Sequence, residues 1–151
     1  MDLRKRRVAE IMHREVVTIT AHEKLDLTQD IMSAGRVRHL PVVDEDQRVI
    51  GIVSDRDLLA AAMTKVLDFD PASRRTFLRS IEVGEVMAKE VVSVTPDTEL
   101  GEVARIFVEQ KIGCVPVLDE DGELLGLVTE TDLIAAAFSI EQEDDRRVGE
   151  G

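Results

Sequence analysis

The sequence contains no tryptophan and no tyrosine, and four phenylalanines are its whole aromatic content. Proteins that bind single-stranded nucleic acid normally stack the bases on aromatic side chains. The formal net charge of −12 also opposes broad contact with a polyphosphate backbone. These two features argue against a nucleic-acid partner. With so few aromatic side chains, the core is expected to consist mainly of Val, Ile and Leu.

Cysteine and histidine are equally scarce. The single cysteine, Cys114, cannot form an internal disulfide, and its apolar neighbours favour a small buried side chain. There is no secretory signal and no apolar run of membrane length, so we expect a reduced, cytoplasmic location and no membrane contact. The three histidines show no paired spacing, which argues against a metal site.

The chain also lacks the usual signatures of catalysis. It has no Cys/His or Ser/His nucleophile pattern and no glycine-rich phosphate loop. We therefore rank an enzyme behind a binding module and a structural module, and we name no catalytic residue.

What the chain does contain is an internal repeat. Residues 8–62 and 83–137 align without a gap at a constant shift of 75, so that Met12 matches Met87 and Asp57 matches Asp132. A fixed repeat defines the building unit. Each copy is close to the lower size limit for an independent core, so the two copies are expected to share one. We divide the chain into a basic N-terminal arm (1–7), repeat 1 (8–62), a linker (63–82), repeat 2 (83–137) and a charged tail (138–151).

Each repeat predicts the order strand, helix, strand, strand, helix, which is a mixed α/β (α+β) fold. The β-branched runs at 16–19 and 91–94 are typical of strands, and 40–43 with 49–53 predicts a hairpin, as does 115–118 with 124–128. Thr20 and Thr95 stand where helix N-caps are expected. In repeat 2 the next helix should bury Leu100, Val103, Ala104 and Phe107. The helix of repeat 1 should be less deeply buried, because Thr28 and Gln29 interrupt its stripe.

The segments outside the repeats have their own expectations. The basic arm at 4–7 is expected to be solvated, or else to contact an acidic patch on another subunit. The linker contains Asp70-Pro71 and Arg74-Arg75, a pattern typical of a helix end, a turn and a polar connector. The charged tail from 141 to 151 is expected to fray.

The most informative local pattern is Gly51-x-x-Ser54-x-x-Asp57, matched by Gly126-x-x-Thr129-x-x-Asp132. In one interpretation the hydroxyl residue simply caps a helix and the carboxylate favours its positive end. In the other, the hydroxyl and the free amides bind a phosphate, and the carboxylate accepts hydrogen bonds from a ribose diol. Residues alone leave both interpretations open.

Two full-length copies of this pattern resemble a tandem pair of cystathionine-β-synthase (CBS) motifs, called a Bateman module. The resemblance covers residues 8–137 and implies two small sheets related by a pseudo-twofold axis. It also implies clefts between the motifs that hold AMP, ADP, ATP or S-adenosylmethionine, with Asp57 and Asp132 toward ribose and Ser54 and Thr129 toward phosphate.

The resemblance further implies that adenine is lined by aliphatic side chains and backbone. The implied base-lining positions are Thr18, Ile19, Val37, His39, Leu40 and Pro41 in repeat 1, and Ser93, Val94, Ile112, Cys114, Val115 and Pro116 in repeat 2. Around the first cleft stand Arg36, Arg38, His39 and Arg56, where the second has Lys111, Gly113, Cys114 and Thr131. Arginine's planar fork suits phosphate, so phosphate-binding capacity is concentrated in repeat 1. A solvated face for these arginines, and a packing role for His39, remain open.

We expect a non-catalytic sensor that binds an adenosyl ligand and is read by an unidentified effector protein. The alternative is a structural dimerisation module with no ligand. Homodimer formation through the outer helices is compatible with the alanine runs at 60–62 and 135–137, although alanine is also simply a good helix former.

Overall fold

The computed structural model describes residues 2–65 and 70–142, which form two compact units. We call residues 17–65 with 70–91 the Asp57 unit, and residues 2–16 with 92–142 the Asp132 unit. No helix among these residues is both long enough and apolar enough to cross a membrane.

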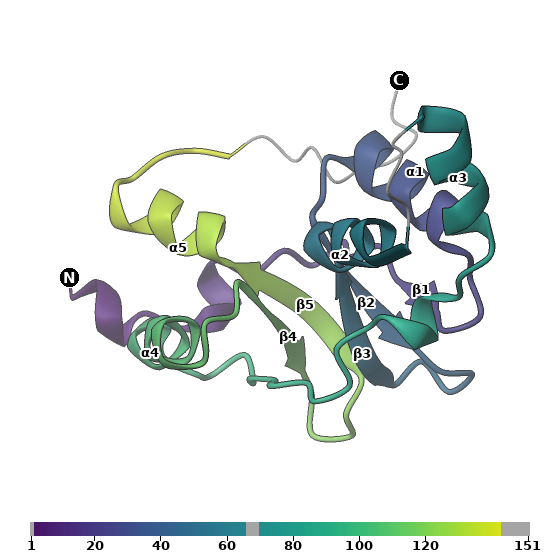
Figure 1. Ribbon diagram of the computed structural model, residues 1–151. Helices are drawn as coiled ribbons and strands as arrows, with labels where there is room; N and C mark the ends of the chain where they lie inside the picture. The colour runs from purple at the N-terminus through teal and green to yellow at the C-terminus, as the bar shows by residue number, and fades with distance from the viewer. Residues whose placement is uncertain (1, 66–69, 143–151) are drawn as a thin grey trace. The chain divides into compact units, whose positions relative to one another are not determined.

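The Asp57 unit contains a three-stranded sheet with helices packed beside it (Figure 1). Its elements in chain order are β1 (Ile19–Thr20), α1 (Leu25–Gly35), β2 (His39–Val43), β3 (Val49–Ser54), α2 (Asp55–Lys65), α3 (Pro71–Arg79) and the 3-10 turn η3 (Val83–Glu85). Strand β2 lies in the middle, parallel to β1 and antiparallel to β3, which confirms the predicted hairpin. The buried core is aliphatic and includes Leu25, Leu40 and Leu78.

The Asp132 unit repeats this mixed α/β plan. Its elements are the 3-10 turns η1 (Leu3–Lys5) and η2 (Val8–Glu10), then α4 (Leu100–Gln110), β4 (Cys114–Leu118), β5 (Leu124–Thr129) and α5 (Glu130–Ala137). Strands β4 and β5 form the second predicted hairpin. Val94 makes an isolated parallel bridge to Val117, at the place that β1 takes in the Asp57 unit. Cys114 is buried, as its apolar neighbours predicted.

The segment that opens each repeat packs in the unit that holds the other repeat. His13 forms an antiparallel bridge with Leu127 of β5, and Ala88 forms the equivalent bridge with Ile52 of β3. A glycine makes room for each bridge. A Cβ on Gly126 would lie 2.6 Å from the His13 carbonyl oxygen, so no side chain fits there unless the backbone shifts.

The predicted helix starts at Thr20 and Thr95 are wrong. The N-caps of helices α1 and α4 lie four residues later, at Lys24 and Glu99, and neither of these residues makes a side-chain cap. Instead, the first amides are satisfied by backbone carbonyls of distant segments. The Leu25 amide donates to the Ile81 oxygen at 3.0 Å, and the Leu100 amide donates to the Arg6 oxygen at 2.8 Å. Tertiary contacts supply what a local cap was expected to supply.

Two further expectations about these segments are corrected. Thr28 is fully buried, because its hydroxyl donates to the Lys24 carbonyl at 2.8 Å and so brings no unsatisfied group into the core. Ala104 is exposed, although Leu100, Val103 and Phe107 of the same stripe are buried. The first strands of both repeats are also shorter than predicted, since regular pairing starts at Ile19 and, in repeat 2, is limited to Val94.

The segments outside the repeats are more ordered than predicted. The polar connector contains helix α3, which Asp70 caps by accepting from the Ala72 amide. The basic arm is held by its own chain: the Arg7 guanidinium donates to the Asp97 carbonyl at 2.8 Å, close to the start of α4. Residues 143–151 of the predicted fraying tail lie outside the described residues, whereas Gln142 makes a hydrogen bond within the Asp132 unit.

Candidate functional site

Both units place a hydroxyl and a carboxylate at the corner where a strand ends and a helix begins. In the Asp57 unit, the Ser54 amide donates to Asp57 Oδ2 at 2.8 Å and the Asp57 amide donates to Ser54 Oγ at 3.2 Å. In the Asp132 unit, the Thr129 amide donates to Asp132 Oδ2 at 2.7 Å and the Asp132 amide donates to Thr129 Oγ1 at 3.4 Å. The predicted capping role is therefore confirmed at both corners.

The Asp132 carboxylate has further partners. Its side chain is completely buried, and its Oδ1 lies 2.5 Å from His13 Nε2 and 3.0 Å from the Gln142 side-chain nitrogen. Because an ionised carboxylate can only accept hydrogen bonds, the His13 Nε2 carries the shared proton. Burial on its own raises the pKa of Asp132, but the bonds from His13, Gln142 and the Thr129 amide outweigh it and leave the pKa below its ordinary value of 3.8.

The Asp57 carboxylate lacks both of these partners. At the shift of 75, the residue that corresponds to His13 is Ala88, whose side chain carries no polar group. Asp57 is half-buried, and in the described part of the chain its side chain is bonded to the backbone of Ser54. The hydrogen bond that the Asp57 carboxylate accepts is made by its Oδ2.

Each unit also contains a cavity. One of about 380 Å³ lies beside Asp132 and is lined by Arg6, Ile11, Asp132, Ala135, Ala136, Ser139, Ile140, Glu141 and Gln142. The other, of about 510 Å³, lies in the Asp57 unit and is lined by Gln29, Met32, Ser33, Arg36, Val37, Arg38, Asp55, Leu58, Leu59 and Arg74. No cluster of three His, Cys, Asp or Glu side chains suited to a metal occurs in residues 2–65 or 70–142.

The structure distributes the predicted site residues unevenly. The second cavity brings Arg36, Val37 and Arg38 together, and the first contains Asp132. Seven predicted base-lining residues are buried inside their own units: Ile19, Leu40, Pro41, Val94, Cys114, Val115 and Pro116. Thr129 is buried at its corner. The other predicted residues are exposed or half-buried and lie outside the two cavities: Thr18, His39, Ser54, Arg56, Asp57, Ser93, Lys111 and Ile112. The ligand-binding roles of all these residues stay predictions.

Most residues that line these cavities were not among the predicted ones, and neither was His13, the partner of Asp132. His13 aligns with Ala88 at the shift of 75, and this difference between the repeats could have pointed to His13 as a site residue. Gln142 and Arg74 lie outside both repeats, so no comparison of the two copies could have pointed to them.

Known proteins share this architecture. The CBS domain family profile matches residues 8–64 and 83–139. A CBS domain-containing protein of Dictyostelium discoideum is 32% identical over 127 residues, a match that spans 84% of this chain and 88% of that protein. The chloroplastic CBS domain-containing protein CBSX1 of Arabidopsis thaliana is 31% identical, and the match spans 91% of this chain but 64% of CBSX1. The crystal structure of CBSX2 in complex with AMP superposes with a TM-score of 0.74 at 26% identity, covering 90% of this chain and 99% of that one.

Proposed function

Because this chain belongs to the CBS domain family, we propose that it is a non-catalytic sensor of an adenosine-containing ligand, namely AMP, ADP, ATP or S-adenosylmethionine. The observation that carries this proposal is the duplicated corner at which Ser54 with Asp57, and Thr129 with Asp132, join a strand to a helix. The AMP complex of CBSX2 supports the adenosyl class of ligand.

In this proposal the Asp57 carboxylate accepts hydrogen bonds from a ribose diol, and the Ser54 hydroxyl lies toward phosphate. The two corners differ in their readiness for this task. Asp57 is half-buried, whereas Asp132 is buried and already accepts from His13 and Gln142. A ligand at Asp132 must displace those bonds, while a ligand at Asp57 need not. We therefore assign the stronger ligand binding to Asp57.

The predicted base-lining residues form the rest of this proposal. With no Tyr or Trp in the chain, adenine is held between aliphatic side chains and by backbone groups. Ligand binding changes the conformation that an effector protein reads, and it does so only through different affinities for two states. We also propose a cytoplasmic location, where a reducing environment preserves the free thiol of Cys114.

Calorimetric titration and thermal unfolding of the full chain test the proposal. At a concentration of about 100 times its Kd, a bound ligand should add about 2.7 kcal/mol to the free energy of unfolding. We expect this gain with at least one compound among AMP, ADP, ATP and S-adenosylmethionine. Asp57→Asn should reduce it strongly. Asp46→Asn, which removes the same charge from an exposed turn, is the matched control and should leave the gain intact.

The competing function is a ligand-free dimerisation module, and a specific observation favours dimer formation. Exposed apolar side chains recur at equivalent positions of α2 and α5, the last helix of each repeat. Leu59 (46% exposed) matches Ile134 (57%), and Met63 (60%) matches Phe138 (74%), which caps the end of α5. Large exposed apolar side chains in matched positions suit a second copy of the chain. Sedimentation of wild type and Ile134→Glu tests the dimer. If the chain forms a dimer and no adenosyl compound stabilises it, the dimerisation module is supported and the sensor is refuted.

A further inference from the structure

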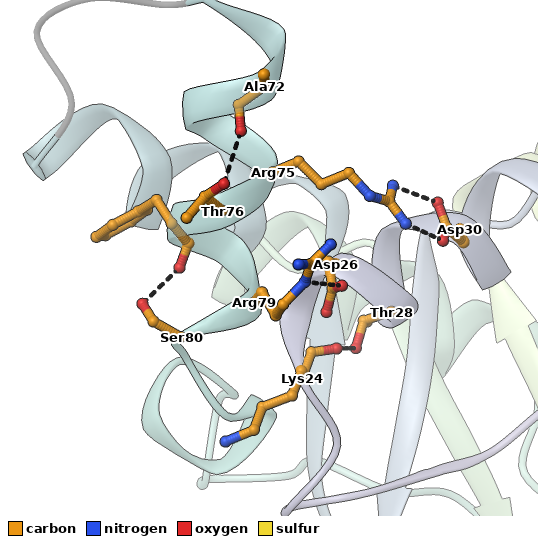
Figure 2. Close-up of polar contacts among 10 residues, drawn as sticks. Lys24, Asp26, Thr28, Asp30, Ala72, Arg75, Thr76, Arg79 and Ser80 are labelled. Carbon is orange, nitrogen blue, oxygen red and sulfur yellow. Dashed lines mark hydrogen bonds and ion pairs between the residues drawn. The ribbon is translucent and has the colours of Figure 1, made fainter.

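Helix α3 lies outside the sequence repeat and is attached to α1 by two arginines. Figure 2 shows Arg75 and Arg79 of α3 reaching Asp30 and Asp26 of α1. The two terminal nitrogens of Arg75 donate to the two carboxylate oxygens of Asp30 at 3.1 and 2.8 Å, and Arg79 Nε donates to Asp26 Oδ2 at 3.4 Å. These ion pairs join the two helices through polar side chains.

The third arginine of the helix, Arg74, takes no part in these ion pairs. It lines the cavity of about 510 Å³, and its Nε is buried without a hydrogen-bond partner among the described residues. A buried donor that lacks an acceptor costs free energy, and such a group in a folded protein calls for a missing partner. An acceptor that enters the cavity from solution would satisfy this donor.

Two more guanidinium groups line the same cavity. Arg36 ends α1 in the left-handed conformation (φ 52°), and this turn places Arg36 and Arg38 on either side of the half-buried Val37. Arg38 also accepts, through its carbonyl, from the Asp55 amide at 2.9 Å, which fixes it at the start of α2. The lining thus carries three guanidinium groups and one carboxylate, that of Asp55, in a chain whose net charge is −12.

We propose that this cavity is a phosphoryl-binding site completed by Arg74 of helix α3. Guanidinium groups present paired donors that match phosphate oxygens, and an excess of them over carboxylates selects an anion. The phosphoryl group belongs either to the adenosyl ligand of the proposed function, on which the inference then rests, or to a separate phosphorylated compound. Met32 and Leu58 on the apolar wall also accommodate an uncharged part of the ligand.

Calorimetric titration of the full chain with tripolyphosphate, ATP and adenosine tests this site. Arg74→Gln should weaken tripolyphosphate binding by about tenfold or more, the loss typical of one charge-assisted hydrogen bond. Arg74→Lys keeps the positive charge but loses the paired donors of the guanidinium group. Its affinity for tripolyphosphate should lie between those of wild type and Arg74→Gln. Arg75→Gln is the matched control on the same helix, because its partner is Asp30 rather than a cavity group, and should bind like wild type.

The three compounds distinguish the source of the phosphoryl group. If it belongs to the nucleotide, Arg74→Gln weakens ATP but leaves adenosine unchanged, while Asp57→Asn weakens both. If it belongs to a separate compound, Arg74→Gln weakens tripolyphosphate and leaves ATP unchanged. Tripolyphosphate binding that depends on Arg74 in a chain that binds no adenosyl compound would refute the proposed function and uphold this site.

The site is overturned if neither tripolyphosphate nor ATP binds, or if both bind Arg74→Gln as tightly as wild type. Loss of helix α3 could mimic the expected result. Circular dichroism of Arg74→Gln and Arg75→Gln reveals such a loss, and Arg38→Gln offers a second variant in an exposed turn that does not belong to α3. Wild-type affinity in Arg38→Gln together with Arg74→Gln would also refute the site.

Discussion

The corners at Asp57 and Asp132 share a backbone motif but differ in what surrounds the carboxylate. Each carboxylate accepts from the amide of the hydroxyl residue three positions before it. At Asp132, the buried side chain also makes hydrogen bonds with His13 and Gln142, whereas the residue aligned with His13 in the other repeat is Ala88. The motif therefore fixes the position of the carboxylate, and residues outside the motif supply its further hydrogen-bond partners.

Removing each carboxylate in turn should give the largest difference between the two corners. Asp132→Ala leaves His13 and Gln142 facing a gap in a buried network, and we expect it to lower the free energy of unfolding by about 3 kcal/mol. Asp57→Ala removes a helix cap that is partly solvated, which costs about 1 kcal/mol. Urea unfolding of both variants measures the difference between these two losses in the free energy of unfolding. Equal losses would show that the partners of Asp132 add nothing.

Changing His13 and its aligned counterpart Ala88 should give the next largest effect on stability and ligand binding. His13→Ala removes a charge-assisted bond to a buried carboxylate, and we expect a loss of about 2 kcal/mol in urea unfolding. Arg14→Ala, in the adjacent exposed position, serves as the control and should change little. The reverse change, Ala88→His, should give Asp57 an imidazole partner and weaken adenosyl ligand binding there. Unchanged ligand affinity in Ala88→His would contradict the idea that such a partner competes with ribose.

A smaller effect is expected at Gln142, the other partner of Asp132. Gln142→Ala removes one hydrogen bond at 3.0 Å and should cost about 1 kcal/mol. Glu141→Ala changes the neighbouring residue, for which no bond to Asp132 is seen, and should be close to neutral. Thermal unfolding of both variants makes the comparison, and a larger loss in Glu141→Ala than in Gln142→Ala would speak against the bond.

The smallest expected effect is a change in pH dependence. Because folding lowers the pKa of Asp132 below 3.8, its ionised form stabilises the folded chain above that pH, and this contribution is lost as the pH falls through the folded-state pKa. Carboxyl-carbon NMR titration should therefore give Asp132 a pKa below 3.8, and His13→Ala should raise it. A pKa that stays unchanged in His13→Ala would assign the lowering to the other bonds.

The repeat and the two hairpins could be predicted from sequence because they depend on local pattern. Apolar runs, a proline at the third position of β2 and β4, and polar turns at residues 44–47 and 119–122 define the hairpins. The start of α1 could not be predicted in this way, because the Ile81 carbonyl that satisfies its first amide is far away in the chain. The same limit applies to the site: Ser54 and Asp57 follow from a motif, whereas Arg74 enters only through tertiary packing of a helix outside the repeat.

The exchange of opening segments has a consequence for any attempt to study half of this protein. A fragment that ends at residue 65 would carry β3 without the Ala88 backbone that pairs with Ile52. It would also carry His13 without its partner Leu127. The backbone at Ile52 and at His13 would therefore both lack their pairing segments. Exposed strand edges of this kind promote aggregation. The smallest piece expected to behave as a soluble protein is therefore one that spans both repeats.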